Sequence, residues 1–284
     1  MTPTLVQHRH DRPSTELTSP TEAHARARDW AEIQERMLVP LYESVYERLE
    51  TDSGTKLLGL GCGSGLALLI AASRGAGVTG VDTDRERLAL ARDRMGAARG
   101  GAGARAELLD GDASAAEGPG RPPYNLITAF QPIGGAAGDT ENLVPALKTS
   151  VGLSEHGAAV VLTSWGPPER CATSGVLRVA CRLTDRLRTS GGYRPALRDD
   201  LEDVAHQAGL KPDGSGRVAC PFGYADMDSA VRGMLSTGLY TAAIQATDQA
   251  QVEKEITEAL HPYKRRDGTV WMPNVFRYLI ARTP

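Results

Sequence analysis

The chain has 284 residues, of which 41% are hydrophobic, and its formal net charge is −3. This composition supports an ordinary folded core, and the length fits one α/β domain with additions or two small domains. No basic stretch of the kind that binds nucleic acid is present, so a polynucleotide partner is not expected. No apolar run approaches the length of a membrane span, and no signal peptide is evident.

The four cysteines are scattered along the chain, and none belongs to a C-x-x-C pair. We therefore expect neither a metal centre nor disulfides, and a reducing, cytoplasmic location fits. Residues 1–22 are polar and contain three prolines, which predicts a flexible tail. His8 and His10 lie in this tail, where a solvated role is favoured over metal binding.

Residues 23–50 are predicted to form an N-terminal helical cap, broken into two pieces near Pro40. The apolar positions of this segment recur at helical spacing: Trp30, Ile33, Met37, Leu38, Leu41, Val45 and Leu49. Tyr42 and Tyr46 lie one helical turn apart. The remaining residues, 51–284, are predicted to form one domain with a helical insertion at about residues 226–260.

The stretch 56–84 organises this domain. Its pattern predicts a buried strand at 56–60, a glycine-rich turn, a helix at 66–73 and a second strand at 78–81. Gly61, Gly63 and Gly65 permit backbone conformations closed to other residues and let a ligand approach the main chain. The helix begins directly after them, so its free N–H groups could hold an anionic group. The pattern is half of a nucleotide-binding βαβ unit.

Asp82 ends the second strand about 20 residues after Gly61, where an acidic side chain accepts hydrogen bonds from ribose hydroxyls. A carboxylate there disfavours the 2′-phosphate of NADP. The dinucleotide fingerprint G-x-G-x-x-G would place its third glycine at position 66, which is Leu66. An NAD-dependent oxidoreductase is therefore the weaker interpretation.

Residues 57–65, L-L-G-L-G-C-G-S-G, resemble the first motif of the class I S-adenosylmethionine methyltransferases, roughly V-L-D-x-G-C-G-x-G. The resemblance implies S-adenosyl-L-methionine as cofactor and S-adenosylhomocysteine as product. It also implies an α/β fold: a Rossmann-like, seven-stranded, mostly parallel sheet with helices on both faces and an antiparallel last strand. Gly61, Cys62, Gly63 and Gly65 would pass under the methionine part, and Asp82 would hold the ribose.

One position departs from the motif. Where the family usually has an acid that helps to hold the methionine amino group, this chain has Gly59.

The pattern continues with a helix at 85–99, strands at 106–109 and 124–130, a helix at 141–151 and a strand at 158–164. By resemblance, Asp112 and Ala113 contact the adenine, whereas Phe130 and Gln131 face the methionine or the acceptor. Asn125 replaces an aspartate that is common in the family. His156 is expected in the turn before the fifth strand, in a structural role.

The run W-G-P-P-E-R, residues 165–170, resembles a segment of small-molecule methyltransferases of actinobacterial type. It would place Trp165 and Glu169 at the ligand edge of the sheet. By resemblance, Trp30, Tyr42, Tyr46 and Trp165 are candidate substrate-lining residues, with plain packing as the competing interpretation for each.

The last third of the chain predicts helices at 177–187, 199–209, 226–239 and 250–260, and strands at 216–221 and 274–281. It contains no unmistakable catalytic motif. His206 and Glu169 are weak candidates for a general base. The motif resemblance covers residues 56–165, and the remainder agrees only in the order of its elements.

We therefore predict a methyltransferase that acts on a small molecule, expected to belong to secondary metabolism such as antibiotic biosynthesis. Methylation at O, N or C stays open, and a homo-oligomer is compatible with the sequence. The alternative is a protein of this fold that binds S-adenosylmethionine or S-adenosylhomocysteine without methyl transfer, as a regulator or a scaffold for cyclisation. Gly59 and Asn125, which replace two acids usual in the family, motivate this alternative.

Overall fold

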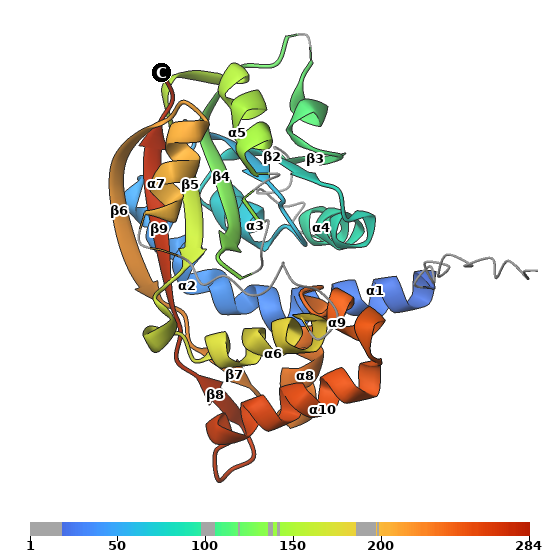
Figure 1. Ribbon diagram of the computed structural model, residues 1–284. Coiled ribbons are helices and arrows are strands. Elements are labelled where there is room, and N and C mark those ends of the chain that lie inside the picture. Colours follow the sequence, from blue (N-terminus) through green and yellow to red (C-terminus); the bar gives the residue numbers. More distant parts are fainter. Residues whose placement is uncertain are drawn as a thin grey trace, which may run out of the picture.

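The computed structural model describes residues 19–97, 106–118, 120–135, 139–140, 143–185, 197 and 199–284. Most of the predicted tail, with His8 and His10, lies outside these residues. The described chain forms two halves (Figure 1). One is a seven-stranded sheet with helices on both faces. The other is a group of helices, with a two-stranded sheet, near the ends of the central strands.

The large sheet has the strand order β3-β2-β1-β4-β5-β9-β6. Strands β1 to β5 are mutually parallel, and β9 runs antiparallel to both β5 and β6. The predicted seven-stranded sheet with an antiparallel last strand is confirmed. Its strands are β1 (Lys56–Leu60), β2 (Gly77–Asp82), β3 (Ala106–Asp110), β4 (Tyr124–Ile133), β5 (Ser154–Trp165), β6 (Lys211–Ala219) and β9 (Val275–Arg282).

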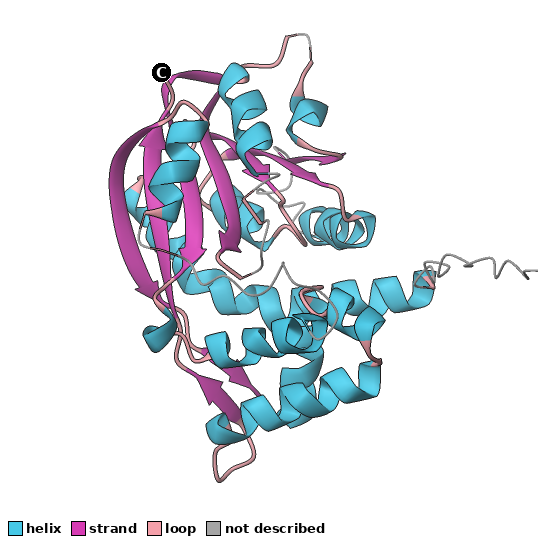
Figure 2. Ribbon diagram, viewed as in Figure 1, coloured by secondary structure: helices cyan, strands magenta, loops and turns pink. Residues whose placement is uncertain are grey.

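Two hydrophobic clusters cover the two faces of this sheet, because alternate residues of a buried strand point to opposite sides. Leu57 belongs to the cluster under α2, α3 and α4, whereas Leu58 belongs to the cluster under α5 and α7. Figure 2 shows helices on both sides of the strands. These helices are α2 (Val39–Arg48), α3 (Leu66–Ser73), α4 (Arg85–Ala97), α5 (Leu143–Gly152) and α7 (Asp200–Gln207).

The N-terminal segment is helical, as predicted, but its geometry changes twice. Helix α1 (Pro20–Asp29) starts with a capping box between Ser19 and Glu22. A π-helical turn (Trp30–Gln34) and a 3₁₀ turn (Glu35–Leu38) then lead into α2. Pro40 lies in the first turn of α2, where a missing N–H costs nothing, so the predicted break lies just before this proline.

The second half of the molecule contains α6 (Thr173–Asp185), α8 (Met227–Ser236), α9 (Thr241–Ala246), α10 (Gln249–Leu260) and the hairpin of β7 (Phe222–Tyr224) with β8 (Val270–Met272). Sequence patterning missed α9 and the hairpin, which are too short to show a period. It also placed His156 in a turn, whereas β5 begins earlier, at Ser154, which pairs with Tyr124. His156 therefore lies in a strand.

Candidate functional site

The glycine loop follows β1 at the carboxyl edge of the sheet, where open α/β folds bind their ligands. Gly61, Gly63 and Gly65 have φ angles of 59°, 58° and 78°. This left-handed conformation strains any residue with a Cβ, so the three glycines are required by the backbone itself. The amide of Cys62 donates to the carbonyl of Val81 at 3.0 Å, which fixes the loop to β2.

Asp82 meets the loop directly. Its Oδ2 accepts a hydrogen bond from the Gly63 amide at 2.6 Å, and its Oδ1 accepts one from the Asp84 amide at 2.8 Å. The structure therefore brings together the acid and the glycine loop, as the spacing between Gly61 and Asp82 in the sequence indicated. Each carboxylate oxygen can accept a second hydrogen bond, so both retain capacity for a ligand hydroxyl.

Asp112 follows β3 beside this site and faces its own turn. Its Oδ1 accepts hydrogen bonds from the Ser114 amide at 2.9 Å and the Ser114 hydroxyl at 2.6 Å, which start a short 3₁₀ helix. These bonds hold the pKa of Asp112 below its usual value. The Gly111 amide donates to the Asp82 carbonyl at 3.0 Å, so the ends of β2 and β3 are joined. Ala113 is buried. The adenine contact predicted for Asp112 and Ala113 stays a prediction.

Cys62 is buried within the loop, and burial followed by the nearby Asp82 charge raises the pKa of its thiol to about 12. The thiol therefore stays protonated at physiological pH.

Packing accounts for the glycine that departs from the family motif. Gly59 on β1 pairs with Gly80 on β2, and the side chain of Leu68 from α3 lies over both. A Cβ on residue 59 would lie 2.8 Å from Cδ2 of Leu68. The space of the missing acid is thus filled by an apolar side chain, and α3 approaches the sheet closely.

Asn125, the second departure, lies at the opposite edge of the sheet. Its Oδ1 accepts from the Lys56 amide at 2.8 Å, and its Nδ2 donates to the Gly54 carbonyl at 3.0 Å. An aspartate could not make the second bond, because an ionised carboxylate only accepts. Asn125 therefore fastens the start of β1 and does not reach the glycine loop.

Trp30 lies on the glycine loop. A Cβ on Gly63 would be 2.6 Å from Cζ3 of Trp30, so the indole edge packs against that glycine. The guanidinium of Arg87 stacks on the indole at 4.1 Å and donates to the Ser236 carbonyl at 3.0 Å. Trp30 was predicted to line the acceptor site, but the structure places it at the loop assigned to the cofactor. Arg87 links it to α8.

Glu35 is the residue of this site that sequence patterning missed. Its side chain is 2% exposed. It accepts hydrogen bonds from the Ser64 hydroxyl, from Arg94 at 2.9 Å and, weakly, from the Leu66 amide at 3.4 Å. The start of α3, expected to be free for an anionic ligand, already faces this carboxylate. In the sequence, the only indication that Glu35 could belong to the site was its position inside the predicted cap.

Tyr42 and Tyr46 are buried, with exposed fractions of 3% and 0%, and pack on Phe130 with ring centroids 4.8 and 5.6 Å apart. Burial raises the pKa of both hydroxyls, so both stay protonated. In this structure they are core residues and present no open surface to a substrate. Gln131 is exposed, and its Oε1 lies 3.5 Å from the position of a Cβ on Gly61.

Trp165 ends β5 and packs against Phe276 and Phe222, with ring centroids 4.6 and 5.8 Å away. It remains partly exposed, and its Nε1 lies 3.1 Å from the position of a Cβ on Gly135. Glu169 is exposed on a short 3₁₀ helix after this strand.

His206 does not belong to the site. It is exposed on the last turn of α7, which leads into β6 at Lys211, and Lys211 pairs with Arg282 at the end of β9. Because β9 is antiparallel, this is the amino edge of the parallel strands, opposite the glycine loop (Figure 1). A general base at His206 would be too far from a ligand on the loop.

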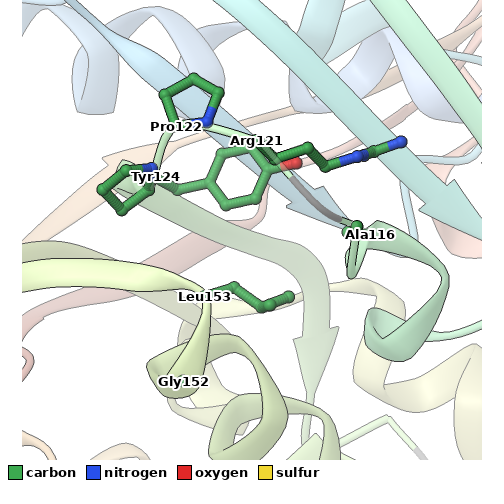
Figure 3. Close-up of a pocket in the computed structure, with 8 residues that line it drawn as sticks. Ala116, Arg121, Pro122, Tyr124, Gly152 and Leu153 are labelled. Carbon is green, nitrogen blue, oxygen red and sulfur yellow. The ribbon is translucent and has the colours of Figure 1, made fainter.

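A pocket of about 170 Å³ also lies at the amino edge, beside the start of β4 and the end of α5 (Figure 3). Arg121, Tyr124 and Leu153 are among its lining residues, and Arg121 pairs with Glu107 at 2.5 Å. It is remote from the glycine loop and has no part in the site.

Within the described residues, no cluster of three or more His, Cys, Asp or Glu could hold a metal ion, and no helix could span a membrane.

No protein-family model and no curated protein sequence matches the chain. Solved structures do match it. A candidate methyltransferase from Bacillus halodurans C-125 matches with a TM-score of 0.54 and 14% identity, over 86% of this chain and 98% of that one. The fold is that of the class I methyltransferases.

Two further structures have this fold. The phosphoethanolamine N-methyltransferase 2 of Haemonchus contortus, solved with S-adenosyl-L-methionine, matches with a TM-score of 0.52 and 15% identity, over 94% of this chain and 58% of that one. The [4+2]-cyclase SpnF matches with a TM-score of 0.51 and 20% identity, over 86% of this chain and 80% of that one. At such identities the likeness concerns the fold alone.

Proposed function

We propose that the protein is an S-adenosylmethionine-dependent methyltransferase with a small-molecule acceptor. The observation that carries this proposal is the contact between Asp82 and Gly63, 2.6 Å, at the carboxyl edge of a methyltransferase-type sheet. It places a carboxylate with free acceptor capacity beside a loop of left-handed glycines. S-Adenosylmethionine is a nucleoside with an amino-acid chain. Its ribose hydroxyls need a hydrogen-bond acceptor, and its amino-acid chain needs a backbone that it can approach closely.

The geometry of the loop fits such a ligand. Among the described residues, a Cβ on Gly61 would meet only Oε1 of Gln131, at 3.5 Å, so the backbone at Gly61 can be approached. Asp82 would hold the ribose, and Asp112 with Ala113 would lie at the adenine. When bound, S-adenosylmethionine supplies an electrophilic methyl carbon, so the protein contributes mainly the placement of the acceptor.

The acceptor would bind between the carboxyl edge and the helices packed below it. Trp165, which is partly exposed, and Gln131, which is exposed, are candidates at this edge. Helices over this edge would enclose the acceptor, which favours a small metabolite and is in line with the expected role in secondary metabolism. The atom that is methylated stays open among O, N and C, since an oxygen acceptor would need a base and none is identified beside the loop.

The alternative proposal is a protein that binds S-adenosylmethionine or S-adenosylhomocysteine without methyl transfer. Gly59 favours it, because the motif position that usually carries the acid for the methionine amino group has no side chain here, and Leu68 fills the space. Turnover separates the two: methyl transfer to any small acceptor supports the first proposal, and tight binding without transfer supports the second.

The first experiment is calorimetric titration with S-adenosylmethionine and S-adenosylhomocysteine. Wild type should bind both, and Asp82→Ala should abolish or strongly weaken the binding. Asp213→Asn is the matched control, since Asp213 pairs with Arg282 at 2.8 Å on the exposed edge strand β6. Failure of wild type to bind either compound would contradict both proposals.

A further inference from the structure

A carboxylate from outside the βαβ unit is built into the glycine loop. Oε2 of Glu35 accepts from the Ser64 hydroxyl and from Arg94, and its Oε1 faces the first turn of α3 through Leu66. A Cβ on Gly63 would lie 3.4 Å from Oε1 of Glu35. Glu35 thus borders the second half of the loop, whereas Asp82 and Asp112 lie at the ends of β2 and β3.

The π-helical turn explains how Glu35 reaches the loop. The amide of Glu35 donates to the carbonyl of Trp30, five residues earlier. In a π turn such residues lie roughly above each other, whereas in an α-helix they would lie on different faces. Trp30 and Glu35 therefore face Gly63 together, one through an indole edge and the other through a carboxylate. Single π turns of this kind are frequent at functional sites.

Burying this charge is expensive, which argues for a specific role. Desolvation raises the pKa of Glu35, while Ser64 and Arg94 oppose the shift. Arg94 also donates to the Ser64 carbonyl at 2.8 Å and to its hydroxyl at 2.7 Å. A buried ion pair of this type is often no more stable than an apolar substitute. What it supplies here is a fixed hydrogen-bond geometry for Ser64 and for the start of α3.

The motif position that usually carries an acid is filled by Leu68 over Gly59, so no carboxylate comes to the loop from β1. We propose that Glu35 is a positioning residue for the amino-acid half of the cofactor, holding the second half of the glycine loop in the conformation that receives it. The cap segment thereby supplies the carboxylate that β1 lacks. This inference rests on the proposed function, and it assigns no direct contact between Glu35 and the reacting atoms.

The test compares two ligands. S-Adenosylhomocysteine contains the amino-acid chain, whereas 5′-methylthioadenosine has the same adenosine and thioether but lacks that chain. Calorimetric titration of Glu35→Gln should show about a tenfold weaker affinity for S-adenosylhomocysteine, which corresponds to about 1.4 kcal/mol. The affinity for 5′-methylthioadenosine should stay within about twofold of wild type, because the ribose and adenine residues are untouched.

Glu32→Gln is the matched control. Glu32 lies in the π turn that precedes Glu35, its side chain is 65% exposed, and among the described residues it pairs with Arg28, at 3.2 Å, so neither affinity should change. Ser64→Ala, which removes one hydrogen bond of Glu35, should weaken S-adenosylhomocysteine binding in the same direction by a smaller factor. If Glu35→Gln folds poorly, Ser64→Ala allows the same comparison of the two ligands.

Equal losses for the two ligands in Glu35→Gln would show a general structural role and overturn the inference. An unchanged affinity for S-adenosylhomocysteine would overturn it as well. If wild type binds neither ligand, the proposed function itself fails, an outcome distinct from both. Thermal unfolding of each variant, recorded without ligand, separates lost binding from lost folding.

Discussion

The two sides of the glycine loop obtain their carboxylates from different regions of the molecule. Asp82 ends the neighbouring strand β2 and accepts from the Gly63 amide. Glu35 comes from the N-terminal cap, 29 residues before its partner Ser64. The first acid is tied to the loop by the local βαβ geometry and the second by tertiary packing alone. One part of the site is therefore local in sequence and the other is brought in by tertiary packing. Only the local part, Asp82 with the glycine loop, shows a recognisable spacing in the sequence.

The largest effect is expected at the residue where the two sides meet. Gly63→Ala introduces a Cβ at φ 58° and against Trp30, and the strain and overpacking together should cost about 2 to 5 kcal/mol of unfolding free energy. Urea unfolding measures this loss. In a Trp30→Ala background the same substitution should cost less, since the steric part disappears. An equal cost in both backgrounds would contradict the contact between cap and loop.

Restoring the acid of the family motif at position 59 should lower the unfolding free energy, because it disturbs the packing of α3 on β1. Gly59→Asp forces a side chain against Leu68, whose Cδ2 would lie 2.8 Å from the new Cβ, and overpacking of this kind costs about 1 to 3 kcal/mol. The penalty should shrink in a Leu68→Ala background. A stable Gly59→Asp variant with improved S-adenosylhomocysteine binding would show that the loop still has room for an acid from β1.

A smaller effect is expected at the edge of the sheet remote from the loop. Asn125→Asp loses the hydrogen bond to the Gly54 carbonyl and should lower the unfolding free energy by about 1 kcal/mol. The affinity for S-adenosylhomocysteine should equal that of wild type. A large loss of affinity would mean that Asn125 acts on the site, contrary to its position.

The remaining prediction concerns pH and distinguishes the buried acid from an exposed one. Burial raises the pKa of Glu35 above its ordinary value of 4.5, so the folded protein binds this proton more tightly than the unfolded chain does. The unfolding free energy of wild type relative to Glu35→Gln should therefore fall as pH rises above 4.5, by at most about 1.4 kcal/mol per pH unit. It should level off once the pH exceeds the folded-state pKa. A difference independent of pH would contradict the raised pKa.

The central strands of the sheet were predictable because each carries its own evidence, whereas β6 (Lys211–Ala219) has no apolar run and was predicted too late in the chain, at 216–221. Buried parallel strands appear as short apolar runs, and glycines in the left-handed conformation leave few alternatives. Residues 56–60 and 66–73 therefore coincide with β1 and α3. The antiparallel last strand came from the family resemblance, and the register confirms it.

The cap and the roles of single side chains were less predictable. An amphipathic stripe indicates that residues 23–49 pack on the domain, but not which residue faces which neighbour. Trp30 was expected at the acceptor and lies on the loop, while Tyr42 and Tyr46 are core residues. His206 appeared as a candidate base because of its residue type, whereas its distance from the loop follows from the pairing of β6 with β9, which residue type does not reveal.

The π turn between Trp30 and Glu35 makes the length of this segment a property of the site. Deleting one residue there would rotate everything on one side of the deletion by about 100° relative to the other, so that either the indole or the carboxylate would leave Gly63. Substitutions at Ala31 or Glu32 keep the number of residues and therefore preserve the relative orientation of Trp30 and Glu35. Insertions and deletions before Ser19, outside the capping box, leave it unaltered. For homologous chains, conservation of spacing between an aromatic residue and a buried acid is therefore a more stringent criterion than identity of the residues between them.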